Sequence, residues 1–172
     1  MADLTEILNG LDLSAVVLPD DKLRECDFFY ELMLHQTDRD KFRWVIGAFL
    51  NACYGYLEYK AAYFHYAYCD PETGETVEDW ESLETLRKYI RIFQNKNKSG
   101  FVKTSGLSEL MSKLYKFRAI STHDGGIEIL KVGENLPADF HIGKYIGKGV
   151  PAIAFCSEII QFFRSIESEL NE

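Results

Sequence analysis

Apolar side chains recur at intervals of three and four residues along much of this chain, a pattern typical of amphipathic helices. Between the apolar stretches lie clusters of Asp, Gly, Ser and Thr, which favour loops and helix starts. The pattern predicts helices over 20–36, 37–66, 76–93, about 105–118 and 151–172. Thr37 and Asp40 resemble a capping box at the second helix, and Pro151 is expected in the first turn of the last.

The second predicted helix has the widest apolar face, which indicates that it lies at the centre of the core. Small side chains are interspersed along it at Gly47, Ala48, Ala52 and Gly55. Small residues allow backbones to approach, so we expect another helix, in the same chain or in a second copy, to pack closely here.

A different pattern separates the last two helices. Gly125 and Gly126 break the helical periodicity, and the sequence IEILKV that follows alternates branched residues as a strand does. A second extended piece, FHIGKYI, is expected to pair with it. We therefore predict an all-α, up-down bundle of four to five helices with a small β-hairpin-like insertion before the last helix. Residues 1–172 form one domain, with 1–19 as an N-terminal arm or short helix.

Composition places the chain among intracellular globular proteins. Hydrophobic residues make up 47% and charged residues 27% of the 172 positions, and the N-terminus lacks the features of a secretory signal. Polar residues interrupt the apolar region 44–67, which argues against a membrane span. Cys26, Cys53, Cys69 and Cys156 have no metal-ligand spacing and are interpreted as free thiols, so we expect a cytoplasmic protein with no metal and no cofactor.

The charge of the chain is segregated. Nine basic residues and one acidic residue, Glu109, lie between Leu86 and Arg118, giving this segment a charge of +8. The rest of the chain must then carry −16, because the total is −8. A protein of this total charge does not bind nucleic acid over its whole surface, but the basic segment could contact phosphates.

Arg118 and His123, in the sequence LYKFRAISTHDGG, are the strongest candidates for chemistry. A histidine can move protons near neutral pH, and an arginine matches the oxygens of a phosphate, so the pair could cleave RNA without a metal. On an ideal helix the two side chains point about 140° apart. They would meet only if the helix end loosens or a second copy contributes. The alternative interpretation is a helix-end histidine favoured by the helix dipole and a surface arginine.

The order of these segments resembles the HEPN superfamily of small helical-bundle proteins in prokaryotes. Three segments carry the resemblance: FFYELMLHQTDRDKFRWVIGAFLNACYGYLEY as an early helix pair, LYKFRAISTHDGG as an arginine-to-histidine motif, and VPAIAFCSEIIQFFRSIESEL as a closing helix. The resemblance implies a metal-independent endoribonuclease or RNA-binding protein of a toxin–antitoxin or defence system. It also implies a homodimer and a protein partner such as an antitoxin. Arg118 and His123 match the catalytic motif, whose second position, often polar in active members, is here Ala119.

Lysines in the basic segment are the candidate RNA-binding residues: Lys96, Lys98, Lys103, Lys113 and Lys116. Tyr115 and Phe117 could stack on bases, although Phe117 is expected to face the core. Many HEPN relatives are inactive. The alternative to an RNA-directed enzyme is therefore a non-catalytic helical module for dimerisation or protein interaction.

Overall fold

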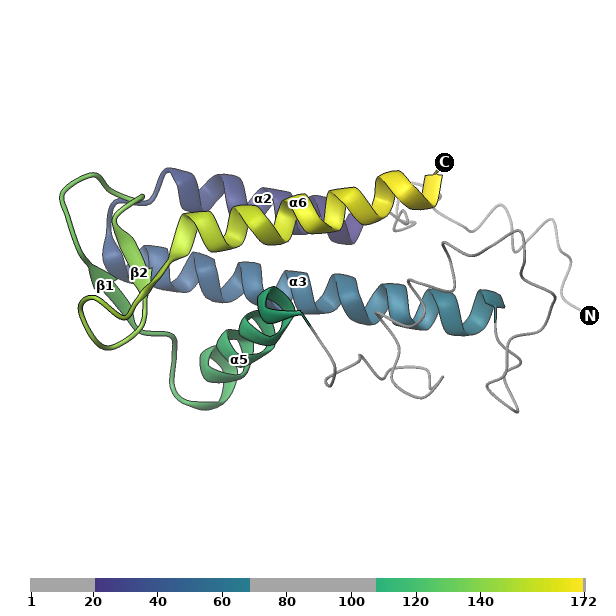
Figure 1. Cartoon of the computed structure of the whole chain (residues 1–172), viewed down its shortest axis with the longest axis horizontal. Helices are drawn as coiled ribbons and strands as arrows, with labels where there is room; N and C mark the ends of the chain where they lie inside the picture. Colours follow the sequence, from purple (N-terminus) through teal and green to yellow (C-terminus); the bar gives the residue numbers. More distant parts are fainter. Residues whose placement is uncertain (1–20, 69–107, 172) are drawn as a thin grey trace, which may run out of the picture.

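The structure, a computed structural model, describes residues 21–68 and 108–171 of the chain, and side chains within 21–63 and 108–169. These residues form four helices and a small antiparallel sheet that precedes the last helix (Figure 1). The elements are α2 (Asp21–Leu34), α3 (Arg39–Tyr68), α5 (Glu109–His123), β1 (Ile129–Lys131), β2 (Phe140–Ile142), β3 (Val150–Pro151) and α6 (Ala152–Asn171). The predicted helical bundle with an insertion before its last helix is confirmed. The arm 1–19 and the predicted helix 76–93 lie outside the described residues.

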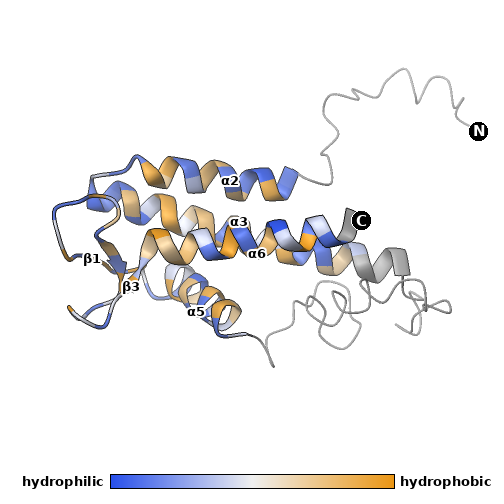
Figure 2. Cartoon of the chain, turned by 45° about the horizontal axis from the view of Figure 1, so that its top comes forward, coloured by the Kyte–Doolittle hydropathy of each residue, from blue (hydrophilic) through white to orange (hydrophobic). Residues whose placement is uncertain are grey.

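The four helices surround one core. α2 packs along α3 and also touches α6, while α5 touches both α3 and α6 (Figure 1). Figure 2 shows that each helix carries both hydrophobic and hydrophilic positions, as the three- and four-residue spacing requires. Helices α3 and α6 meet through large side chains, with the rings of Tyr56 and Phe163 4.4 Å apart. The core is therefore rich in aromatic side chains that are fully buried, namely Phe42, Phe49, Tyr56, Phe140 and Phe163.

A small residue of α3 allows another helix of the same chain to pack closely against it. Gly47 is buried, and a Cβ atom built on it would lie 2.9 Å from Oγ of Ser121 on α5. This confirms the expected close approach of another helix and identifies that helix as α5. At Gly55, by contrast, an added Cβ would meet no atom within 4 Å in the part of the chain that the structure describes.

The start of α3 differs from the prediction. Oδ1 of Asp38 accepts hydrogen bonds from the backbone N–H groups of Lys41 and Asp40, at 2.9 and 3.0 Å. Asp38 therefore caps α3, and the capping box predicted from Thr37 is wrong. A carboxylate one residue further along satisfies the same free N–H groups and adds a charge that the helix dipole favours.

The insertion is a three-stranded sheet rather than a hairpin. β1 pairs with β2 as predicted, with Ile129 opposite Ile142. β2 then pairs with β3, where His141 lies opposite Pro151. Pro151 therefore ends a strand and α6 begins at Ala152, so the prediction that Pro151 lies in the first helical turn is wrong. Figure 1 shows the sheet at one end of the bundle, beside the start of α6.

A buried charge joins α3 to α6. Nζ of Lys60 lies 2.7 Å from Oε1 of Glu167, and the hydroxyl of Tyr56 donates a hydrogen bond to the same oxygen. The Lys60 side chain is only 10% exposed and that of Glu167 25%. Lys60 also lies over the ring of Tyr56. Lys60, Tyr56 and Glu167 therefore each contact the other two.

Cysteines within the described residues are buried free thiols, as predicted: Cys26, Cys53 and Cys156. Cys69 lies outside those residues. None of the described helices combines the length and the hydropathy needed to cross a membrane.

Candidate functional site

Helix α5 carries both residues of the candidate catalytic pair. Oγ of Ser108 accepts a hydrogen bond from the backbone N–H of Met111 and starts the helix. The helix continues without interruption to His123, where the backbone N–H of Asp124 donates to the carbonyl of Ile120. The two glycines that follow, with positive φ angles of 76° and 125°, turn the chain toward the sheet. The helix end therefore does not loosen between Arg118 and His123.

Arg118 and His123 consequently leave α5 in different directions. Five residues of α-helix separate them, which turns the two side chains about 140° apart. Arg118 lies against α3, with its guanidinium carbon 4.3 Å from the ring centroid of Tyr54. His123 is exposed at the end of the helix. On an α-helix the two side chains therefore start out on different sides of α5.

Tyr54 lies against the guanidinium of Arg118, and a second tyrosine, Tyr115, packs on Tyr54. Tyr54 packs edge-on against Tyr115 of α5, with ring centroids 5.6 Å apart. Burial raises the pKa of Tyr54, and the charge of Glu58 raises this pKa further, while the positive charge of Arg118 acts in the opposite direction. Burial also raises the pKa of Tyr115. Both phenols therefore stay neutral near neutral pH, and the ring of Tyr54 meets the cation uncharged.

The stacking leaves hydrogen-bonding capacity on Arg118. Its Nε atom is buried and has no hydrogen-bond partner among the described residues. A guanidinium stacked on a ring keeps its N–H groups in its own plane, and a phosphate could accept from those that reach solvent, which the buried Nε does not. The hydroxyl of Thr122 does not reach outward to help, because it donates to the backbone carbonyl of Arg118. Ser121 faces Gly47 instead of solvent.

His123 belongs to another side of α5. It lies seven residues after Lys116, which places the two side chains within about 20° of each other around the helix axis. Both are exposed. Lys113 lies three residues before Lys116, about 60° away around the helix axis. The basic side of α5 is therefore defined by Lys113, Lys116 and His123, and Arg118 is not part of it.

A cavity of about 440 Å³ lies next to this basic side. Lysines approach it from two elements, since Lys113 and Lys116 come from α5 and Lys144 and Lys148 come from the turn after β2. Its remaining lining consists of Phe117, Ile120, Asp124, Gly126, Ile127, Glu128, Ile142, Gly143 and Val150. We call this space the lysine cavity.

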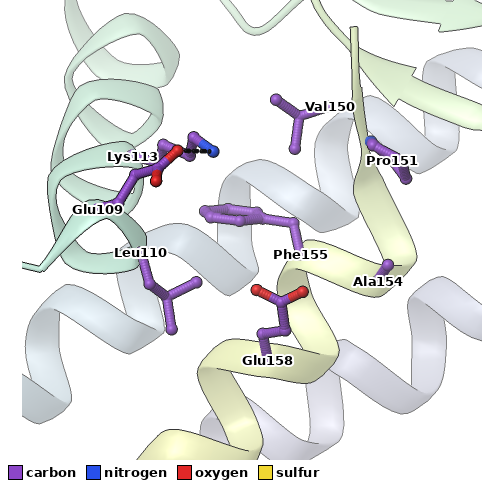
Figure 3. Close-up of a pocket in the computed structure, with 8 residues that line it drawn as sticks. All are labelled: Glu109, Leu110, Lys113, Val150, Pro151, Ala154, Phe155 and Glu158. Atoms are coloured by element: carbon purple, nitrogen blue, oxygen red, sulfur yellow. Dashed lines mark ion pairs between the residues drawn. The ribbon is translucent and has the colours of Figure 1, made fainter.

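The four lysines differ in their ion pairs. Lys113 lies 2.7 Å from Glu109, and Lys144 lies 3.4 Å from Glu128. Figure 3 shows the first pair at the edge of a second cavity of about 360 Å³, where the ring of Phe155 projects from α6 toward α5. Lys116 and Lys148 form no ion pair with any residue in 21–63 or 108–169. These two carry the uncompensated positive charge of the lysine cavity.

Of the predicted RNA-binding residues, Lys113 and Lys116 are described, while Lys96, Lys98 and Lys103 lie outside the described residues. Phe117 faces the core as expected, with its ring edge-on to Phe155. Lys144 and Lys148 were not among the predicted residues. They lie some thirty residues after Lys113 and Lys116, and only the return of the chain through the sheet brings them near α5.

Other candidate groups are dispersed. His35 is exposed after α2, and His141 is half-buried on β2. Within the described residues, no three side chains of His, Cys, Asp or Glu lie close enough to hold a metal ion. Comparison with known protein families, with curated proteins and with solved structures finds no significant match.

Proposed function

We propose that this chain is a cytoplasmic RNA-directed protein of HEPN type, and that it cleaves RNA without a metal when two copies associate. The observation that carries the proposal is the basic side of α5. There exposed His123 lies on the same side of the helix as Lys113 and Lys116, and these two lysines line a cavity that Lys144 and Lys148 also reach. Lysines attract and hold phosphates, and histidine moves protons near neutral pH. The resemblance of the segment LYKFRAISTHDGG to the HEPN arginine-to-histidine motif supports the same conclusion.

The chemistry is an internal transfer at phosphorus. The ribose 2′-oxygen attacks the adjacent phosphorus while a histidine accepts its proton, and the bond from phosphorus to the 5′-oxygen breaks. A second proton donor protonates the departing 5′-oxygen. The products are a 2′,3′-cyclic phosphate and a 5′-hydroxyl. An arginine stabilises the negative charge that builds on the phosphate oxygens.

A second copy resolves the divergence of the two side chains. Arg118 stacks on Tyr54 of α3, and position 123 lies about 140° from position 118 around the helix axis, so the two side chains leave α5 on different sides. In a symmetric dimer, Arg118 of one protomer and His123 of its partner can face the same phosphate, and symmetry creates two such sites. Dimerisation is thus part of the proposal, as is an antitoxin-like protein that controls the activity.

The test is RNA cleavage in EDTA, with analysis of the product ends. The wild-type protein should leave cyclic phosphates, and His123→Ala should lower the rate by about 10²–10⁴-fold. His35→Ala is the matched control, because His35 is another exposed histidine outside the proposed site. Cleavage that survives in His123→Ala, or that requires a divalent metal, would refute the assignment of His123.

A mixing experiment tests the shared site directly. Arg118→Ala and His123→Ala should each be inactive alone. When they are mixed and allowed to exchange subunits, half of the dimers become mixed and each has one intact site, so about a quarter of the wild-type activity should return. No recovery, despite measured subunit exchange, would show that the site does not combine residues of two copies. A monomer by light scattering at micromolar concentration would also contradict the proposal.

A non-catalytic interaction module is the second candidate. Phe28 and Leu32 lie one turn apart on α2 and are 59% and 37% exposed, and Trp44 on α3 is 68% exposed. Exposed large apolar side chains are typical of protein-binding surfaces. This candidate predicts no cleavage of any RNA. It also predicts that Trp44→Ser, unlike His123→Ala, weakens association with a partner.

A further inference from the structure

The lysine cavity combines three kinds of surface. Its floor is apolar, because Phe117, Ile127 and Ile142 are core residues whose side chains border it. Its volume of about 440 Å³ falls in the range of cavities that bind small organic ligands. Uncompensated positive charge lies on two sides of it, at Lys116 and Lys148. A ligand that fits has an apolar body and carries negative charge.

Carboxylates narrow the choice of ligand. Asp124 and Glu128 also line the cavity. They would repel a second anionic group and would contribute nothing to an acyl chain, which has no hydrogen-bond donors. They would accept hydrogen bonds from the amino group of a nucleobase, as Asp and Glu do with cytosine. A ligand that matches all three surfaces has a phosphate for the lysines, a ring system for the apolar floor and an amino group for the carboxylates.

The turn that supplies Lys144 and Lys148 is held in a fixed shape. The backbone N–H of Lys148 donates to the carbonyl of Tyr145 at 3.1 Å, closing a tight turn. Gly147 has a φ of 81°, the value that the third residue of a type II turn requires. A fixed turn loses little conformational entropy when a ligand binds, so the backbone that carries the lysines is in place before binding.

We propose that the lysine cavity binds one unpaired nucleotide, with the phosphate between Lys116 and Lys148 and the amino group of the base against Asp124 or Glu128. The inference rests on the proposed function only for the source of the nucleotide, which is a single-stranded stretch of RNA. A free nucleoside monophosphate has the same chemistry. The site therefore favours cytosine, adenine and guanine over uracil, which has no amino group.

Calorimetric titration of the full chain with CMP, UMP and inorganic phosphate tests the chemistry of the site. CMP should bind about five-fold or more tightly than UMP, and inorganic phosphate should bind most weakly. Lys116→Gln and Lys148→Gln should each weaken CMP binding by about two- to five-fold. Lys22→Gln, which removes the same charge at the start of α2, should have no effect. The double substitution Asp124→Ala and Glu128→Ala should remove the preference for CMP while circular dichroism shows an unchanged fold.

Short single-stranded oligomers of C and of U, and an RNA hairpin, separate the two sources of the nucleotide. Tighter binding of the C oligomer than of CMP, with weaker binding of the hairpin, identifies unpaired RNA as the ligand. Binding of CMP without binding of any RNA would sink the proposed function but leave the cavity as a site for free nucleotides. Metal-independent cleavage that persists in Lys116→Gln and Lys148→Gln, with no binding of CMP, would overturn this inference and leave the proposed function standing. Equal affinity for CMP and inorganic phosphate would also overturn it.

Discussion

Replacing Glu167 with alanine should expose the dependence of the bundle on one buried charge. Glu167 lies on α6 and faces Lys60 and Tyr56 of α3. The substitution removes the oxygen that both groups contact. It leaves the ammonium group of Lys60 in a position where its side chain is only 10% exposed.

The expected loss follows from this burial. Removing one partner of a fully buried ion pair costs about 3–5 kcal/mol, because the remaining charge has neither its partner nor water. The side chain of Glu167 is 25% exposed, so water can enter after truncation and solvate part of the charge on Lys60. We therefore expect a loss of about 2–3 kcal/mol in the free energy of unfolding. Glu167→Gln keeps an acceptor for Tyr56 and should lose about 1–2 kcal/mol.

Equilibrium unfolding in urea, followed by far-ultraviolet circular dichroism, measures these differences. Glu158→Ala is the matched control, because Glu158 is exposed on the same helix and should change stability by less than about 0.5 kcal/mol. Lys60→Met tests the cause, since it removes the buried charge and keeps an apolar stem. It should cost less than Glu167→Ala. The explanation fails if Glu167→Ala unfolds within about 0.5 kcal/mol of Glu158→Ala, or if Lys60→Met is the more destabilising change.

Two further predictions concern a helix start and the buried thiols. Hydrogen bonds from backbone N–H groups lower the pKa of Asp38, so its charged form stabilises the fold above the unfolded pKa of about 3.9, and this contribution disappears as pH falls through the lowered pKa. The gap in melting temperature between the wild type and Asp38→Ala should thus narrow from near pH 7 to near pH 2; a constant gap would contradict the role of the charge. Burial raises the pKa of Cys53 and of Cys156, so neither should react with iodoacetamide at mildly alkaline pH until urea unfolds the protein. Peptide mass spectrometry would detect early labelling, which would show that the core opens.

The helices could be predicted because apolar spacing is a local property of the sequence. Helix α6 illustrates this, since its apolar positions at three- and four-residue intervals are those buried in the core. The cap of α3 and the strand β3 could not be predicted, because they depend on more than the local sequence. Thr37 and Asp38 are adjacent residues of similar capping ability, and only the backbone geometry decides between them. Strand β3 has two residues, one of them Pro151, and exists only because β2 lies beside it.

The candidate site depends still more on tertiary structure. The spacing of Arg118 and His123 is visible in the sequence, but an unbroken helix determines that they diverge. The partner of Arg118 is Tyr54, more than sixty residues earlier, which no motif indicates. Lys148 likewise joins Lys116 only through the fold of the insertion. Sequence spacing identified residues of the right chemical type, and packing determines which of them can act together.

Pro151 limits how far strands of other molecules could extend the sheet. β3 is an edge of the sheet, and edge strands with free N–H groups can recruit strands of other molecules. Pro151 has no N–H to donate, and the chain enters a helix at the next residue. This edge is too short and too poor in donors to be extended, so the sheet should resist growth into intermolecular β-structure on the side of β3.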